Sequence, residues 1–253
     1  MIRALWSGAT GMTAQQFNID NISNNLANVN TAGFKRQRVD FQDLYYQNIL
    51  VGRNTAASVG SGVRAAGTYR DFQQGALEGC DDPLFMAIQG QGFFTIQGPD
   101  GNDYYTRDGS FRLDSQGRLV TAAGHYVKLR GGSPVPRNAG ELSVDENGII
   151  RARVGGSFQE FGQIVLTMFP NPAGLDAIGS NLYRETPQSG EGVEVRPGQQ
   201  GAGTVLSGYI EKSNVEIVSE MVNLIIAQRA FELNSKSVET ADQMWAIANN
   251  IRR

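Results

Sequence analysis

Few side chains in this sequence could do nucleophilic or metal chemistry. His125 is the only histidine and Cys80 the only cysteine among 253 residues. A nucleophilic triad needs a base, and no Gly-x-Ser-x-Gly turn occurs, although the sequence leaves open whether a Ser and an Asp lie beside His125. One histidine and one distant cysteine fall short of the usual zinc ligands, and a lone cysteine forms no disulfide within the chain. We therefore predict no catalytic, cofactor-binding or metal-binding residues.

Neighbouring carboxylates are the other candidate chemistry. Asp81 and Asp82 are adjacent, and a second acidic stretch runs from Asp100 to Asp108. Two carboxylates can hydrolyse a glycosidic bond, so a β-rich carbohydrate-active enzyme with helical dimerisation arms is one alternative. Surface turns use the same residues to bind their own backbone, and we favour that interpretation. Turnover of peptidoglycan fragments that is lost on mutation of Asp81 or Asp108 would support the enzyme instead.

Nucleotide, nucleic-acid and membrane binding also find little support. The glycines at 60–67 and 201–203 lack the Gly-x-Gly-x-x-Gly spacing, and no Walker motif occurs. The formal net charge is −3, and the basic run at 34–38 suits the negative end of a helix better than nucleic acid. No run approaches the ~18–20 apolar residues of a membrane span, and the start of the chain lacks the apolar core of a secretory signal. We expect a protein that stays in the cytoplasm or is exported with its N-terminus uncleaved.

The first thirty residues predict a helix with an unusual surface. Leu5, Met12, Ile19 and Leu26 recur every seven residues, which is the spacing of a coiled-coil seam. Several amides three or four apart would share a second face: Asn18, Asn21, Asn25 and Asn28. That face is either solvated or an amide-lined interface, and the scarcity of Lys and Glu favours the interface. The helix should end near residues 30–33, with Gly33 as its cap.

The middle of the chain is typical of β structure. Most of its 31 glycines lie there, and short apolar runs alternate with glycine-bearing turns. The expected strands cover residues 84–88, 93–96, 142–144, 149–154 and 164–169. Asp-Gly and Asn-Gly pairs at 100–101, 108–109 and 147–148, and Gln-Gly at 116–117, predict hairpins, because such turns need positive φ. The spacing indicates an antiparallel sandwich or barrel-like module over residues 68–205.

A connecting segment without clear periodicity precedes this module. Residues 41–50 are compatible with a helical turn or with an extended arm that carries aromatic anchors. Residues 51–67 include many small residues, and we expect this stretch to be flexible. We predict a long extended segment that needs a partner surface for order.

The C-terminal residues 206–253 predict a long helix, because no Gly or Pro occurs after Ser213. Ser213 or Asn214 is the expected N-cap. Two apolar stripes run along this helix, one through Met221, Leu224 and Phe231 and the other through Ile226 and Leu233. The N-terminal helix would cover one stripe, and the other needs another molecule.

Together these patterns predict an α+β fold: paired N- and C-terminal coiled-coil helices plus an antiparallel β module, joined by an extended segment. The expected domains are an inner helical domain (1–33 and 208–253), a connecting segment (34–80) with an insertion at about 46–63, and an outer β domain (81–207).

Four stretches of the sequence resemble a known family, the bacterial flagellar axial proteins of rod and hook. Residues 22–35, Ile-Ser-Asn-Asn-Leu-Ala-Asn-Val-Asn-Thr-Ala-Gly-Phe-Lys, are similar to its N-terminal signature. Residues 208–236 are similar to its C-terminal signature. Gly90-Gln-Gly92-Phe-Phe and residues 105–111 resemble the β module shared by rod and hook subunits. The chain length and the 46–63 insertion are most like the distal rod members.

The resemblance implies self-assembly through residues of both signatures and of the helical seams. These are Leu5, Met12, Ile19, Asn24, Asn25, Leu26, Asn28, Asn30, Gly33, Phe34, Asn214, Met221, Leu224, Gln228, Arg229, Phe231 and Asn234.

The resemblance also implies a function. The chain would be a structural, non-enzymatic subunit of the distal rod that assembles helically into a rigid hollow shaft and transmits torque from motor to hook. Expected partners are further copies of itself, proximal rod proteins, the hook protein, the surrounding ring proteins and the flagellar export apparatus. It would lie in the periplasm-spanning part of the basal body and be exported without a cleaved signal peptide. A proximal rod subunit is the alternative within the family.

Overall fold

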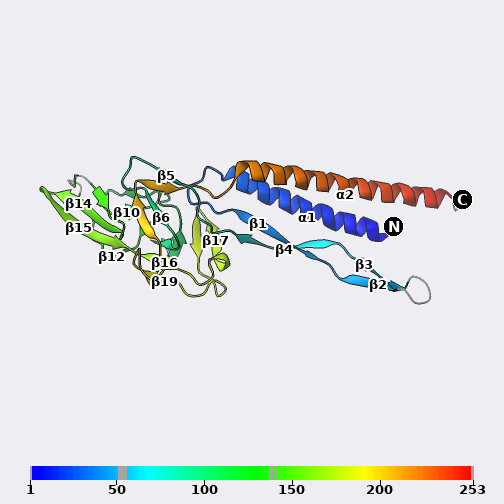
Figure 1. The fold of residues 1–253 in the computed structure, drawn as a ribbon, viewed down its shortest axis with the longest axis horizontal. Coiled ribbons are helices and arrows are strands. Elements are labelled where there is room, and N and C mark those ends of the chain that lie inside the picture. The colour runs from blue at the N-terminus through cyan, green and yellow to red at the C-terminus, as the bar shows by residue number, and fades with distance from the viewer. Residues whose placement is uncertain (1, 51–55, 137–138, 141, 252–253) are drawn as a thin grey trace. The chain divides into compact units, whose positions relative to one another are not determined.

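The computed structural model describes residues 2–50, 56–136, 139–140 and 142–251. The chain divides into two compact units (Figure 1). Unit 1 comprises residues 1–27, 37–70 and 215–253, and unit 2 comprises residues 28–36 and 71–214. The chain therefore passes between the units at four points.

Unit 1 consists of two long helices and an extended β ribbon. Helix α1 (Ile2–Ala27) and helix α2 (Ile217–Ile251) run antiparallel and pack side by side (Figure 1). Strand β1 (Gln37–Asp43) pairs antiparallel with β4 (Val63–Arg70), and both contact α1. Strands β2 (Tyr46–Leu50) and β3 (Ala56–Gly60) continue the ribbon as a second antiparallel pair. Residues 41–50 thus belong to an extended arm, which is one of the two predicted forms, and residues 51–55 lie outside the described residues.

Unit 2 is the antiparallel β module. Its larger sheet has the order β17-β18-β8-β7-β11-β10-β9, with β16 joining β7 and β19 joining β16, and its smaller sheet has the order β12-β15-β14-β13. Two further pairs, β20 with β6 and β21 with β5, bring the end of the module beside its beginning. The bounds are β5 (Leu77–Gly79), β6 (Met86–Gln89), β7 (Phe93–Gln97), β8 (Asp103–Thr106), β9 (Arg112–Leu113), β10 (Leu119–Val120), β11 (Tyr126–Val127), β12 (Leu129–Arg130), β13 (Leu142–Val144), β14 (Ile149–Val154), β15 (Ser157–Ile164), β16 (Leu166–Met168), β17 (Asp176–Gly179), β18 (Leu182–Arg184), β19 (Val193–Val195), β20 (Thr204–Ser207) and β21 (Tyr209–Glu211); a short 3-10 helix covers Pro172–Gly174.

Two buried clusters form most of the core of unit 2. The larger is aliphatic with two aromatic rings and includes Met86, Ile88, Phe94 and Phe111, all fully buried. The smaller is aromatic, and there Phe93 meets the rings of Phe72, Phe169 and Tyr183 edge to face. Edge-to-face aromatic pairs add stability beyond the burial of their area.

The structure confirms an α+β fold with an antiparallel β module, and each of the five predicted strand regions contains a strand. The turns at Gly101, Gly117 and Gly148 have positive φ and connect paired strands, as predicted. The predicted hairpin at 108–109 was wrong, because β8 pairs with β7 and β18 whereas β9 pairs with β10.

Two predicted helix ends were also wrong. Helix α1 ends at Ala27, before residues 30–33, so Gly33 is not its cap. Helix α2 begins at Ile217, because residues 204–207 and 209–211 pair as strands with β6 and β5. Asn214 is therefore not an N-cap, and its side chain has other partners. Among the described residues, no helix combines the length and apolar character needed to cross a bilayer.

Candidate assembly site

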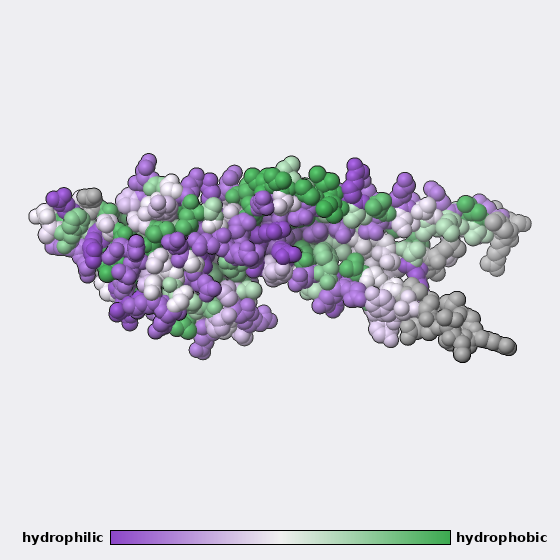
Figure 2. All heavy atoms as spheres, viewed as in Figure 1, coloured by the Kyte–Doolittle hydropathy of each residue, from purple (hydrophilic) through white to green (hydrophobic). Residues whose placement is uncertain are grey.

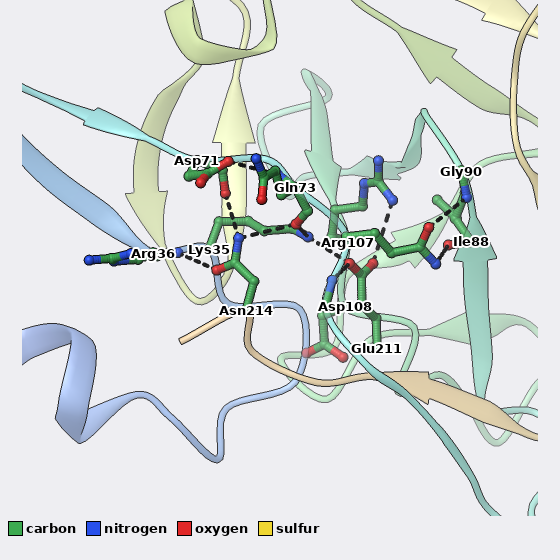
Figure 3. Close-up of polar contacts among 12 residues, drawn as sticks. Lys35, Arg36, Asp71, Gln73, Ile88, Gly90, Arg107, Asp108, Glu211 and Asn214 are labelled. Atoms are coloured by element: carbon green, nitrogen blue, oxygen red, sulfur yellow. Dashed lines mark hydrogen bonds and ion pairs between the residues drawn. The ribbon is translucent and has the colours of Figure 1, made fainter. Parts of the chain in front are cut away.

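A buried group of charged side chains lies in unit 2 (Figure 3). Lys35 Nζ lies 2.6 Å from Glu211 Oε1, and Arg107 Nη1 lies 3.5 Å from Glu211 Oε2. Lys35 also donates to the Gln73 carbonyl at 2.7 Å, and Glu211 Oε1 accepts the Gly75 N–H at 2.9 Å. Two buried cations thus share one carboxylate.

Burial is the largest influence on the pKa values of the two cations in this group. Loss of water lowers the pKa of the Lys35 ammonium, and the Glu211 carboxylate opposes that shift. Burial likewise lowers the pKa of Arg107, whose guanidinium also lies over the Phe93 ring at 5.2 Å. Without Glu211, both cations would be buried without their carboxylate partner, which is the costly arrangement for charges inside a protein.

Asn214 binds two separate stretches of backbone next to this group, one at Arg36 and one at residues 71–73. Its Oδ1 accepts the Arg36 N–H at 2.7 Å, and its Nδ2 donates to the carbonyls of Asp71 at 2.8 Å and Gln73 at 3.1 Å (Figure 3). The Asp71 N–H also donates to the Arg36 carbonyl at 2.9 Å. Residues 36, 71 and 214 stand at three of the four points where the chain passes between the units. We call Lys35, Arg107, Glu211 and Asn214 the junction cluster, because they join the three segments of chain near residues 36, 71 and 214.

Gly33 lies in the same region and needs to be glycine. Its φ is +68°, and its N–H donates to the Glu211 carbonyl at 2.8 Å. A β carbon here would lie 2.6 Å from the Asp108 amide nitrogen and 2.8 Å from the Arg107 carbonyl carbon. Backbone cannot give way as a flexible side chain can, so close packing and backbone conformation both select glycine.

We predict that Gly33→Ala destabilises the protein by clearly more than Gly124→Ala. Gly124 has a similar φ of +84° but no atom within 4 Å of the added carbon. The control therefore carries only the penalty of about 1–2 kcal/mol for a left-handed backbone. Urea unfolding followed by circular dichroism measures the difference, and equal losses for the two variants would show that the packing around Gly33 is unimportant.

In unit 1, Asn25 joins three elements. Its Nδ2 donates to the Gln37 carbonyl at 2.8 Å and to Glu220 Oε2 at 3.3 Å, and its Oδ1 accepts the Gln37 N–H at 3.0 Å. Asn25 is only 1% exposed. Its amide therefore connects the last turn of α1 to the start of β1 and to the first turn of α2.

Small residues allow α1 and α2 to approach closely. A β carbon on Gly8 would lie 2.7 Å from Val238 Cγ2, and one on Gly11 would lie 2.8 Å from Asn234 Nδ2. Ala227 is almost fully buried in α2. The two terminal helices thus pack against each other, whereas their pairing as a coiled coil through the predicted stripes stays a prediction.

A second apolar face of α2 is exposed to solvent. It begins in the first turns of the helix, where Figure 2 shows a hydrophobic patch. We call this face the outer ridge and define it by the exposed residues Ile217, Val218, Met221, Val222, Ile225 and Ile226. Glu220 is the one charged residue between positions 217 and 228, and it is buried beside Asn25. Exposed apolar patches of this kind mark interaction sites.

An apolar groove of about 500 Å³ lies between α1 and the β ribbon of unit 1. We call it the arm groove. It is lined by Trp6, Ala9, Thr10, Thr13, Ala14, Phe17, Leu44, Val63, Arg64 and Ala65.

The residues predicted for self-assembly occupy three kinds of position. Those at the helix seams and in the following turn are half-buried: Leu5, Met12, Ile19, Leu26, Asn28, Phe34, Leu224, Phe231 and Asn234. Asn25, Gly33 and Asn214 serve contacts within their own unit, as described above. The remaining ones are exposed: Asn24, Asn30, Met221, Gln228 and Arg229. Whether any of them contacts another copy stays a prediction.

The carboxylates considered for catalysis act in turns. Asp82 Oδ1 accepts the Leu84 N–H, and Asp108 Oδ1 accepts the Ser110 N–H. One oxygen of each carboxylate is thus taken up by the backbone of its own turn, as is usual for Asp in turns. In the part of the chain that the structure describes, no three His, Cys, Asp or Glu residues cluster as metal ligands.

Comparison with known proteins places this chain among flagellar proteins. Three families match along it: Flagella basal body rod protein at residues 5–35, Flagellar hook protein FlgE/F/G D1 domain at 87–152, and Flagellar basal body rod FlgEFG protein C-terminal at 206–251. The flagellar basal-body rod protein FlgG of Borreliella burgdorferi is 46% identical over the full length of both chains. The FlgG proteins of Caulobacter vibrioides (44% identical over 99% of this chain and all of the relative) and Bacillus subtilis (39% identical over all of both chains) agree.

The chain belongs to the flagellar basal-body rod protein family. It is a structural subunit of the rod, as the resemblance implied, and these relatives give no support to a carbohydrate-active enzyme. A flagellar hook protein, FlgE of Helicobacter pylori, is 43% identical over 58% of this chain and 23% of its own length.

Membership of the rod family directs attention to residues that sequence reasoning missed. Lys35 and Glu211 lie in the two matched terminal segments, and Arg107 lies in the matched β segment. The one signal in the sequence was that these three charged residues lie within segments whose neighbouring residues are mostly apolar, small or glycine. Their role could not be read from the sequence, because Lys35 and Glu211 meet only when the two ends of the chain come together in the fold.

Proposed function

We propose that this rod protein is the subunit of the distal rod and that its copies stack helically into a rigid, hollow drive shaft. The observation that carries the proposal is the outer ridge, a charge-free apolar face that a rod protein leaves uncovered in a single copy. Paired terminal helices would form an inner coiled-coil tube from residues 1–33 and 208–253. Residues 81–207 would form the outer layer, joined to the tube by residues 34–80.

Burial of the outer ridge supplies the adhesion between copies. Each large apolar side chain contributes roughly 1.5–3 kcal/mol when fully buried. Loss of translational and rotational freedom offsets part of this, so several such side chains are needed for each contact. The ridge offers six within ten residues of α2.

The junction cluster gives the proposed shaft a means to resist load. Asn214, Lys35 and Glu211 bond to one another and to the backbone of three chain segments that lead from one unit to the other. A force on one of these segments would therefore be shared by the other two. The protein would act mechanically, without catalysis, and transmit torque from motor to hook. It would adjoin proximal rod proteins at one end, the hook protein at the other and ring proteins around it. It would reach the periplasm through the flagellar export apparatus with no cleaved signal peptide.

Deletion of the gene in its own bacterium tests this function. Purified basal bodies should keep the proximal rod and lack the distal rod and hook, and the gene on a plasmid should restore both. Loss of the proximal rod as well would favour the alternative, a proximal rod subunit. Complete basal bodies in the deletion strain would contradict a role in the rod.

Deletion of residues 46–63 should give a subunit that still exports but builds a more flexible shaft. This segment contains the β2–β3 pair, which we propose clamps onto neighbouring copies. The bending stiffness of purified rods, read from their curvature in electron micrographs, measures the effect. A Gly-Ser segment of equal length should behave as the deletion does. Shafts of normal stiffness from either variant would remove the clamp from the proposal.

A further inference from the structure

The polar side chains that line the arm groove have partners within the same copy, and for Arg64 that partner is Gln42 Oε1 at 3.3 Å. Thr10 Oγ1 donates to the Ser7 carbonyl and Thr13 Oγ1 donates to the Ala9 carbonyl, each at 3.0 Å. Both hydroxyls are therefore satisfied within α1, and the groove has mainly hydrocarbon surface. At its two ends along α1, Trp6 is 65% and Phe17 43% exposed. Such a groove suits an apolar occupant with few polar groups.

The outer ridge has the length and chemistry to fill that groove. Trp6 to Phe17 spans roughly 16 Å of helix, and Ile217 to Ile226 spans roughly 14 Å at 1.5 Å per residue. Val218, Val222 and Ile226 are spaced four apart, so they form a continuous row of the kind that packs into the groove of another element. The outer ridge presents no charge to solvent, because Glu220, the one charged residue between positions 217 and 226, is buried and bonded to Asn25.

The ridge and the groove belong to different faces of one unit. The ridge is on α2, whereas the groove is formed by α1 and the β ribbon, and α1 contacts both α2 and that ribbon (Figure 1). A contact between two unlike faces of identical chains is heterologous. Repetition of such a contact gives a ring if the rotation closes and an open helical filament if it does not.

We propose that the outer ridge of one copy seats in the arm groove of the next copy, so that this single repeated contact propagates the filament. The proposal rests on the rod function and adds to it the pair of surfaces that meet. It makes α2 the inserted element and the α1–ribbon groove the receiver.

Cysteine cross-linking between two differently marked copies tests this contact. In a Cys80→Ser background, one preparation carries Thr13→Cys and the other Val222→Cys, and both positions are exposed. The two are mixed in equal amounts at a concentration that gives filaments and are oxidised briefly. We expect a disulfide-linked dimer that contains one chain of each kind, with at least tenfold more of it than in either preparation alone.

The matched control is Lys236→Cys in place of Val222→Cys. Lys236 is also exposed on α2 but lies roughly 21 Å further along the helix axis, so it should link to Thr13→Cys far less. Filaments that form without the Thr13–Val222 link, or with equal linking at Lys236, would overturn this contact and leave the rod function standing. If the unmodified chain forms no filaments at any concentration and no link appears, the contact and the proposed function are both contradicted.

A charge pair gives a second measurement that does not depend on thiol chemistry. Val222→Glu alone should reduce filament yield strongly, and adding Thr13→Lys to the same chain should recover much of it. Pairing Val222→Glu with Arg64→Ala should not recover it. A double variant that assembles no better than Val222→Glu would count against the pairing of these two faces.

Discussion

Replacement of Glu211 by alanine is expected to lower the Tm of this rod protein by roughly 6–20 °C. The estimate follows from about 3–5 kcal/mol for a buried charge left without its partner and about 2–4 °C per kcal/mol for a chain of this size. The Glu211 carboxylate contacts both Lys35 and Arg107, and its side chain is fully buried. The melting curve by calorimetry or circular dichroism measures the loss.

Glu78→Ala is the matched control, because its carboxylate also pairs with a lysine at the same edge of unit 2. Glu78 lies 2.8 Å from Lys212 Nζ, but both side chains are about half exposed. An exposed pair of this kind contributes about 0–1 kcal/mol. If Glu211→Ala and Glu78→Ala lowered Tm equally, the junction cluster would have no special role in stability.

The deficit of Glu211→Ala should shrink as the pH rises toward 10. Burial already lowers the folded-state pKa of Lys35 below its ordinary 10.5, and removal of the carboxylate leaves nothing as strong to oppose that shift. Between the folded and unfolded pKa values the unfolded chain binds more protons, so the free energy of unfolding increases with pH in that window. Urea unfolding at pH 7 and pH 9.5 would reveal the change, and a deficit independent of pH would mean that Lys35 stays charged or hydrated in the variant.

Substitution of Ile225 by aspartate is expected to suppress assembly while leaving the single copy folded. Ile225 is 56% exposed in the outer ridge, so the monomer loses little packing. Loss of roughly 1.5–3 kcal/mol of burial in each contact, at 1.4 kcal/mol per factor of ten, should raise the critical concentration for assembly about 10- to 100-fold. Sedimentation of assembled material over a dilution series gives that concentration.

Ile178→Asp makes the same chemical change at another exposed isoleucine. Ile178 is 44% exposed in β17 of unit 2, whereas the ridge and the groove are formed by residues of unit 1. The critical concentration of this variant should stay close to that of the unmodified chain, and both variants should show nearly unchanged circular dichroism. Equal inhibition by the two would point to a general effect of added charge rather than to the ridge.

Local patterns in the sequence were sufficient to predict the elements that depend on short-range spacing. The absence of Gly and Pro after Ser213, with apolar residues at helical spacing, predicted α2, and Ile226 and Leu233 of the second predicted stripe are exposed. Val218, Val222 and Ile225 of the outer ridge lie in neither predicted stripe. Alternating apolar runs and Gly-bearing turns predicted strands such as β7 and β14. These signals lie within a few residues of the structure that they specify.

Features that depend on distant partners could not be predicted in this way. Residues 209–211 were assigned to a helix, yet they pair with β5, more than a hundred positions earlier in the chain. Asparagine is a preferred N-cap residue, so the sequence favoured that role for Asn214. Its amide has other partners because residues 36 and 71 lie beside it in the fold. The partners of Asn25 within unit 1 could not be predicted either, because nothing in the sequence places Gln37 and Glu220 beside it. For residues 209–211 and Asn214, tertiary contacts overrode the local preference.

Electron microscopy of the purified, unmodified chain at high concentration tests the assembly of copies most directly. Self-assembly through the outer ridge predicts filaments of helical symmetry with a central channel, and it predicts that they disappear when Ile225→Asp protein is prepared in the same way. Dispersed single copies of the unmodified chain at every concentration reached would contradict it.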